Sequence, residues 1–259
     1  KGIKRMKTFW IVVLVGMVAM SAQAGMFGGG PPDTGMDKLM DLFGKNESFS
    51  ATAHTSMTDD KGHVGHHMLM QFALLDGNVR TEMDMGSAKG DKMPPEAAEQ
   101  MKAMGMDKMI MLRLRSEDKS YIIYPGMKAY CELKRPEQAD GKKKSPPKVE
   151  KTEVGKDEID GHPCVRSKVV MTFEDGHTQE MMVWNAKDLK GFPIKTEMFH
   201  NKGTITTAFR DISQARPDSS LFSLPSDYTA YGSMQEMMMG NMQKMMGGAM
   251  PPGGMPRSG

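Results

Sequence analysis

Short strand-like segments separated by Gly-containing turns run through most of this 259-residue chain. Residues 66–75 and 79–85 flank Asp76-Gly77-Asn78 and predict a hairpin, because Asp, Asn and Gly tolerate the positive φ angles of tight turns. Further strands are expected at 48–55, 109–114, 120–124, 127–133, 152–159, 165–173, 178–184, 193–199 and 204–212. About ten short strands with few helices predict a β-dominated α+β fold, built on a strongly bent antiparallel sheet.

Three short helices are expected around these strands. Residues 36–43 carry apolar side chains at spacings of three and four. Residues 96–104 are good helix formers that follow Pro94-Pro95 and end at Gly105, which suits a helix start and stop. Residues 234–246 contain no proline and predict a terminal helix.

The first 24 residues have the pattern of a secretory signal peptide. Four cations within residues 1–7 precede the apolar run 9–20, and Ser21-Ala22-Gln23-Ala24 ends it with a small-x-small cleavage site. The run is shorter than the ~20 residues that a membrane helix needs. We therefore expect cleavage after Ala24 and a periplasmic or secreted protein of a Gram-negative-type bacterium, with no membrane span after cleavage.

The charge balance and the motifs exclude several functional classes. The chain has 34 Lys+Arg against 32 Asp+Glu, and loss of four cations with the signal peptide changes the net charge from +2 to −2. Binding to nucleic acid depends on clustered cations, so no nucleic-acid partner is expected. No nucleophile elbow, zinc-protease motif, phosphate-binding Gly loop or CxxC motif is present. We therefore expect a protein that is not an enzyme and needs no cofactor.

Two cysteines, Cys131 and Cys164, remain in the mature chain. In an oxidising compartment two cysteines suffice for one disulfide, which is the pairing that we expect here. Two buried free thiols are the alternative.

Three sequence runs in the second half carry a family resemblance. They are Gly-Lys-Asp-Glu-Ile-Asp-Gly-His-Pro-Cys at 155–164, Met-Val-Trp-Asn-Ala-Lys-Asp-Leu-Lys-Gly-Phe-Pro-Ile-Lys-Thr-Glu at 182–197, and Pro-Asp-Ser-Ser-Leu-Phe-Ser-Leu-Pro-Ser-Asp-Tyr at 217–228. The chain resembles the DUF4412 family of exported bacterial proteins over roughly residues 48–230. That family is similar in turn to the LolA/LolB-like periplasmic lipoprotein carriers.

The resemblance implies a LolA-like half-barrel sheet around an apolar pocket, and it supplies no catalytic motif. On this basis Arg80, Tyr121, Tyr124 and Trp184 are the candidate ligand-binding residues. The step from the family to lipid carriage is an analogy at the level of the fold.

Methionine is unusually abundant, with 31 in the chain and nine at or beyond Met234. Met234, Met238, Met242 and Met245 recur on one face of the expected terminal helix. Three hypotheses remain open for that face: an adaptable apolar surface for the sheet or a partner, a copper site built from thioethers, or a lid over a lipid pocket. Many other methionines stand in the strands, and we expect those to serve as core hydrophobes.

The sequence thus predicts a signal peptide at 1–24, a leader with a short helix at 25–47, a LolA-like domain at 48–231 with a polar linker at 134–149, and a Met-rich helix and Gly/Pro tail at 232–259. We expect an exported binding protein for a lipid acyl chain or a lipoprotein in the cell envelope. The alternatives are periplasmic copper binding by the Met-rich C-terminus and an interaction module for an envelope protein.

Overall fold

The computed structural model describes residues 46–85, 95–133, 148–173, 176–200 and 203–245. Their strands are β1 (Ser48–Thr58), β2 (Val64–Leu75), β3 (Asn78–Asp84), β4 (Lys108–Leu114), β5 (Lys119–Tyr124), β6 (Ala129–Glu132), β7 (Lys148–Ile159), β8 (His162–Thr172), β9 (Thr178–Ala186), β10 (Phe192–His200), β11 (Gly203–Ser213) and β12 (Thr229–Tyr231). The helices are α3 (Pro95–Ala103) and α4 (Met234–Met245), with short 3-10 turns η3 (Pro125–Met127) and η4 (Ser219–Phe222). The expected signal peptide, the helix at 36–43 and nearly all of the polar linker lie outside the described residues.

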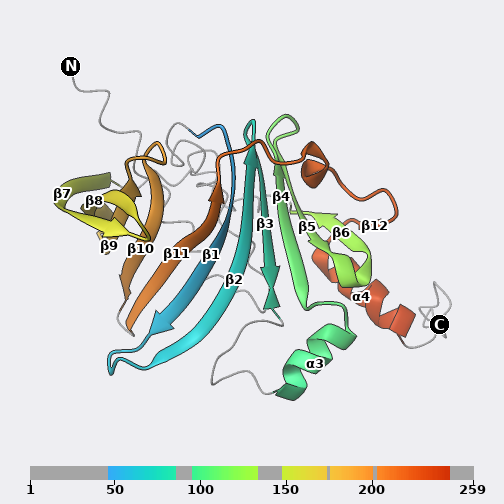
Figure 1. The fold of residues 1–259 in the computed structure, drawn as a ribbon. Helices are drawn as coiled ribbons and strands as arrows, with labels where there is room; N and C mark the ends of the chain where they lie inside the picture. The colour runs from blue at the N-terminus through green and yellow to red at the C-terminus, as the bar shows by residue number, and fades with distance from the viewer. Residues whose placement is uncertain (1–45, 86–94, 134–147, 174–175, 201–202, 246–259) are drawn as a thin grey trace, which may run out of the picture.

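All twelve strands form one sheet in the order β12-β6-β5-β4-β3-β2-β1-β11-β10-β9-β8-β7 (Figure 1). Strands β1 to β6 form one antiparallel meander and β7 to β11 form another. The two meanders join where β1 pairs with β11. Strand β12 adds to β6 in parallel and was not expected from the sequence. The β-dominated class is therefore confirmed.

Two hairpins have the tight turns that the sequence indicates. Between β2 and β3, Asp76 and Gly77 have φ angles of 51° and 91°. Between β7 and β8, Asp160 and Gly161 have φ angles of 51° and 80°. Two consecutive residues with positive φ match the twist of the flanking strands, so these dipeptides set the register of both hairpins.

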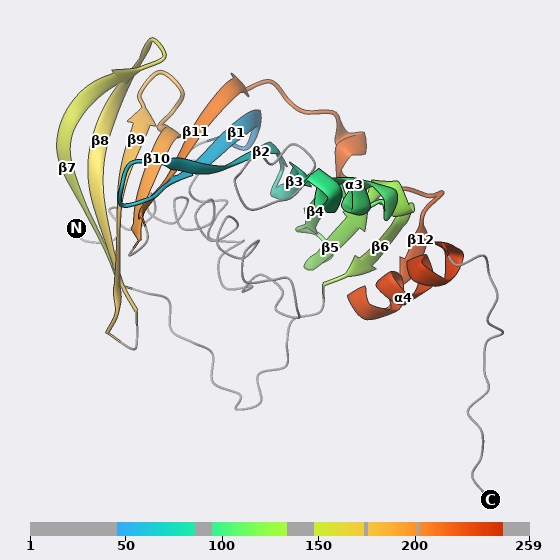
Figure 2. The same cartoon turned by 90° about the horizontal axis from the view of Figure 1, so that it is seen from below.

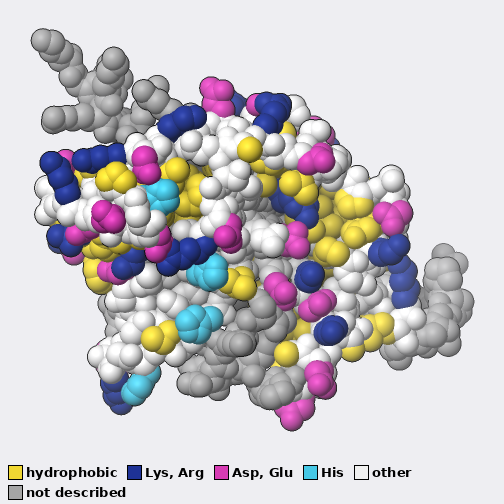
Figure 3. All heavy atoms as spheres, in the orientation of Figure 1, with side chains coloured by type: hydrophobic (Ala, Val, Ile, Leu, Met, Phe, Trp, Pro, Cys, Tyr) yellow, Lys and Arg dark blue, Asp and Glu magenta, His cyan; other side chains and the backbone are white. Residues whose placement is uncertain are grey.

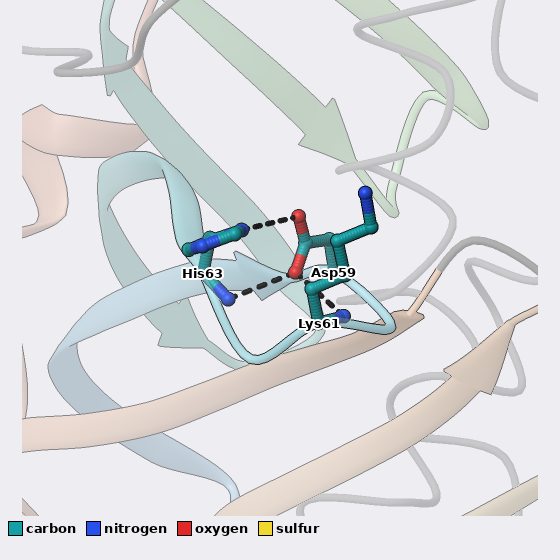
Figure 4. A network of polar contacts seen from close by, with 3 residues as sticks. All are labelled: Asp59, Lys61 and His63. Atoms are coloured by element: carbon teal, nitrogen blue, oxygen red, sulfur yellow. Dashed lines mark hydrogen bonds and ion pairs between the residues drawn. The ribbon is translucent and has the colours of Figure 1, made fainter.

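The turn between β1 and β2 is organised by one carboxylate, as Figure 4 shows. Asp59 Oδ1 accepts hydrogen bonds from the backbone N–H groups of Lys61, at 2.9 Å, and of His63, at 2.8 Å. Asp59 Oδ2 lies 3.1 Å from His63 Nδ1. These bonds, led by the one from the His63 backbone, lower the pKa of the Asp59 carboxyl. His63 is thereby engaged in a structural turn.

The sheet is large, open and curved (Figure 2). The outer, convex side carries η4, whose Phe222 packs on strands β2, β4 and β5. The inner, concave side carries α4, whose Met237 packs beside Ile122 and Cys131 at the β5–β6 end. Because side chains alternate along a strand, β1 presents Phe49, Ala51 and Ala53 to the concave side.

The disulfide prediction is wrong: Cys131 and Cys164 are both free and buried. Cys131 lies in β6 beside Ile122, whereas Cys164 lies in β8 beside Ala186. Eight strands separate β6 from β8 in the sheet, and the two thiols belong to different apolar clusters. A disulfide needs Cα atoms within about 7 Å, so this fold cannot form the bond.

Candidate functional site

The concave side carries a continuous apolar cluster, here called the concave layer. Its buried members are Phe49, Ala51, Ala53, Met70, Phe72, Leu74, Val79, Met83, Val169, Met171, Met181, Val183, Phe192, Met198, Ile205 and Phe209. Partly buried members are Met57, Met68, Met85, Met109, Met111, Val149, Phe173, Leu189 and Ile212. Ten of these 25 side chains are methionine, so the enrichment noted in the sequence is concentrated on this surface.

Aromatic rings anchor the middle of the concave layer. Phe192 packs edge-on against both Phe49 and Phe209, with ring centroids 5.1 and 5.3 Å apart. Phe72 extends this group, 5.9 Å from Phe209. Ala53 lies beside Phe209 and Met70 in the register and has no exposed surface. Rigid rings and small alanines fix the centre, while flexible methionines occupy the rest.

Buried polar side chains also lie on the concave side: Thr81, Thr196 and Ser167 are paired in the register with members of the layer or with Thr207. Thr207 forms a pair with a further threonine. Thr55 of β1 and Thr207 of β11 are opposite each other, buried, and hydrogen-bonded at 3.0 Å between their hydroxyl oxygens. Each hydroxyl satisfies the other, so the pair can be buried without an unpaired polar group. The layer itself is apolar, and the buried Arg113 lies at its edge, opposite Val79 in the register.

No side chain of α3, α4, η3 or η4 belongs to the concave layer. Helix α4 contacts β6 and β12, and η4 packs on the convex side. At the centre of the layer, Ala53, Met70 and Phe209 are each at most 1% exposed.

Arg80 and Tyr121 lie together on the convex side, away from the concave layer. Arg80 donates to the carbonyl oxygen of Leu221 in η4, at 3.4 Å, and to Glu82 at 2.9 Å. Tyr121 belongs to the cluster that η4 covers, and its hydroxyl donates to Glu117 at 3.2 Å. Both residues thus hold η4 and its loop in place.

Trp184 also faces the convex side, in a separate cluster with Cys164 and Ile194. Its indole N–H donates to Asp157 Oδ2 at 2.9 Å. The Lys195 ammonium lies 4.6 Å from the centre of the ring, a cation–π distance. Figure 3, drawn from the same side as Figure 1, shows cationic and anionic side chains interspersed over this part of the molecule.

Tyr124 is the one candidate on the concave side. It packs near the β5–β6 end, where α4 covers the sheet. Its hydroxyl donates to the sulfur of Met109, a member of the concave layer, at 3.5 Å. Burial raises the pKa of this phenol. The structure therefore places Tyr124 beside the concave layer and does not bring it together with Arg80, Tyr121 or Trp184.

The terminal helix is confirmed, and its methionines divide into two groups. Met237 is fully buried, and Met234 and Met238 pack with it against the sheet. Met242 and Met245 are more than half exposed. Ser233 caps α4 by accepting from the Glu236 N–H at 3.1 Å. Part of the methionine face thus docks on the chain's own sheet.

The resemblance implied an apolar pocket, but sequence reasoning did not identify the residues of the concave layer as candidates, although their pattern was present. Methionines two residues apart, as in Met68-Met70 and Met109-Met111, place thioethers on one face of a strand. Of nine strand methionines expected to be core hydrophobes, Met68, Met70, Met83, Met85, Met109, Met111, Met171 and Met181 belong to the layer, and Met182 packs in the Trp184 cluster.

Among the described residues, no cluster of three or more His, Cys, Asp or Glu side chains is arranged to hold a metal ion. In that same part of the chain, no helix is long and apolar enough to cross a membrane.

The chain is a β-dominated protein with a large open curved sheet and an apolar cluster on its concave side. The chain belongs to the DUF4412 family, because the model of that domain of unknown function matches residues 54–190. The resemblance inferred from the sequence runs is thereby confirmed. No curated protein matches the sequence.

Solved structures with low similarity to this chain include those of three proteins. The lipoprotein LppX of Mycobacterium tuberculosis is 11% identical, with 63% of this chain and 85% of that one covered and a TM-score of 0.34. LprF from Mycobacterium bovis is 12% identical, with 77% and 100% covered and a TM-score of 0.37. The LolA superfamily protein NE2245 from Nitrosomonas europaea is 10% identical, with 69% and 91% covered and a TM-score of 0.27.

Proposed function

We propose that this protein binds a lipid acyl chain, free or as part of a lipoprotein, on its concave layer, and that it acts as a non-enzymatic carrier in the cell envelope. The observation that carries the proposal is the composition of that layer: 25 apolar side chains on one face of a single sheet, ten of them methionine. Burial of apolar area is the dominant favourable term in binding such a ligand.

Methionine is the residue that suits an acyl chain of variable shape. Its unbranched thioether has three rotatable bonds and repacks against irregular partners, which is why it is frequent at promiscuous binding surfaces. Leucine and isoleucine would fill the same volume with stiffer side chains. Of the 25 members of the layer, four are leucine or isoleucine. The composition therefore favours an adaptable lining.

The proposal includes two finer points. The curvature of the sheet is that of a LolA-like half-barrel, and its concave layer is the ligand site. Export to the periplasm follows from the signal-peptide pattern of residues 1–24. No residue is assigned a catalytic role, and the apolar character of the layer supports binding alone.

Lipid extraction from the purified mature protein, followed by mass spectrometry, tests the proposal directly. A fluorescent fatty acid then gives an affinity for the ligand-free protein. The informative variant is Ala53→Leu, which adds bulk at the centre of the concave layer. Ala208→Leu is its matched control. Ala208 lies in the adjacent strand and pairs with His54, and the side chains of both residues point to the convex face.

Ala53→Leu should lose most of the bound acyl chain and weaken the fatty-acid probe, whereas Ala208→Leu should keep both. Thermal melting of each variant shows whether it is folded, since overpacking costs about 1–3 kcal/mol. A wild-type protein that carries no acyl chain and does not bind the probe would refute the proposal. Equal probe affinity in the two leucine variants would place the ligand elsewhere.

A further inference from the structure

Helix α4, which carries the exposed methionines, contacts the backbone of a methionine that directly follows α3. Asn241, on α4, donates from Nδ2 to the backbone oxygen of Met104 at 2.9 Å. Met104 directly follows α3 and is 37% exposed. The same Asn241 Nδ2 lies 4.0 Å from the sulfur of Met245. One amide group thus brings the end of α3 and the last turn of α4 together, with a methionine on each side.

Met242 completes this group. It stands three residues before Met245, a spacing that places two side chains next to each other on a helix. Met242 is 60% exposed and Met245 is 55% exposed, so both thioethers are open to solvent. Met234 and Met238, which the sequence also proposed as ligands, pack against the sheet and are set aside.

The chemistry of this group selects its ligand. Thioether sulfur is a soft, uncharged donor that prefers Cu(I) over hard divalent cations, which need carboxylate or carbonyl oxygen. We propose that Met104, Met242 and Met245 form a Cu(I) site between α3 and α4. This site is separate from the concave layer and does not depend on the proposed function.

The proposed Cu(I) site can be distinguished from an apolar docking surface by substitution with leucine. Replacing methionine by leucine keeps an apolar side chain of similar volume but removes the sulfur. A surface that docks a protein or a lipid tolerates this change, whereas a Cu(I) site does not. Leucine variants therefore separate metal binding from apolar docking at the same residues.

The test is an anaerobic Cu(I) titration of the full chain in competition with a chromophoric Cu(I) chelator. The double variant Met242→Leu/Met245→Leu and the single variant Met104→Leu are compared with wild type. Met239→Leu is the matched control: Met239 is 55% exposed on the same helix, but lies about 200° around the helix from Asn241. X-ray absorption at the copper edge identifies the donor atoms.

Met104→Leu should weaken Cu(I) binding by about tenfold or more and the double variant by about 100-fold, since loss of outer-shell partners alone costs 10–100-fold. Met239→Leu should bind as wild type does, and the absorption spectrum should show sulfur donors only. Wild-type affinity in the double variant would overturn the site. Wild-type affinity in Met104→Leu, or nitrogen and oxygen donors at the copper, would equally overturn it.

Discussion

Cys131 and Cys164 are each 1% exposed, and burial raises the pKa of both thiols. A protonated thiol behind packed side chains reacts slowly, because the thiolate is the nucleophile. We predict that the thiols of the native protein react slowly with a thiol reagent. In the unfolded protein, without reducing agent, we predict that two thiols per chain react. Intact mass before and after alkylation in denaturant checks this, and a single disulfide-linked species would contradict it.

Tyr121 gives a prediction about pH. Burial first, and then the Glu117 carboxylate, raise the pKa of its phenol from 10.0 to about 12. The folded state therefore holds this proton more tightly than the unfolded state does. Between pH 10 and about pH 12 the unfolded state has released this proton and the folded state still holds it. The free energy of unfolding should therefore fall as pH rises through this interval. At neutral pH the phenol is protonated in both states and contributes no such slope.

Urea unfolding at pH 10 and at about pH 12 measures this fall. Tyr121→Phe keeps the ring and removes the titrating group, so its stability should fall less over the same interval. A loss of stability that is the same in both proteins would show that other groups cause it.

At the residue scale, the sequence predicted which side chains are buried better than it predicted on which face of the sheet they lie. The strand methionines were expected in the core and are there, because their spacing of two residues sets them on one side of a strand. Arg80, Tyr121 and Trp184 were expected near the ligand, and they lie on the convex side. Which side of a strand is concave depends on the curvature of the whole sheet, and no local pattern encodes that curvature.

At the element scale, the end of α3 is held by two glycines in contact. A Cβ atom on Gly126 would lie 2.6 Å from Gly105 Cα and 2.7 Å from its carbonyl oxygen. The sequence marked Gly105 as the end of the helix, and its φ of 69° agrees with that. The sequence contained no indication of the close approach to Gly126, which joins α3 to η3.

We predict that Gly126→Ala destabilises the protein by about 1–3 kcal/mol, because backbone atoms of Gly105 cannot move aside as a flexible side chain could. Gly65→Ala is the control: a Cβ atom there has its nearest contact at 3.5 Å, an ordinary distance. Chemical denaturation of both variants checks the difference. Equal stability of the two would mean that the glycine contact can relax at no cost.

Some elements could not have been predicted. Strand β12 has three residues and pairs in parallel with β6, so neither length nor alternation marks it. Residues 125–128 were expected to be partly strand, but Pro125 opens the turn η3 and Lys128 has a φ of 46°. By contrast, the hairpins with Asp-Gly turns and helix α4 followed from local chemistry, and they are where the sequence placed them.

At the scale of the whole molecule, the sheet depends on one pairing between distant parts of the chain. Local turns define both meanders, but the β1–β11 pair joins residues such as Thr55 and Thr207 that are 152 positions apart. No hairpin turn specifies such a contact, so the sequence left the strand order open. The same gap made the Cys131–Cys164 disulfide look feasible, since the number of strands between the two thiols was unknown.

The Thr55–Thr207 hydroxyl pair offers a direct test of this junction. Thr55→Val removes one hydroxyl, keeps the shape, and leaves the buried Thr207 hydroxyl without its partner, at a cost of about 1–3 kcal/mol. The reciprocal Thr207→Val should cost a similar amount. The double variant puts two apolar groups of matching shape face to face, so it should be more stable than the sum of the single changes predicts.

A double-mutant cycle from urea unfolding, followed by circular dichroism and by Trp184 fluorescence, measures this coupling. Trp184 reports on the β7–β11 meander, whereas circular dichroism averages over both meanders. Coincident transitions in all four proteins would show that the two meanders unfold together as one cooperative unit. Strictly additive effects of the two valine substitutions would show that the two hydroxyls do not stabilise each other. Separate unfolding transitions would show that the β1–β11 pairing does not couple the two meanders.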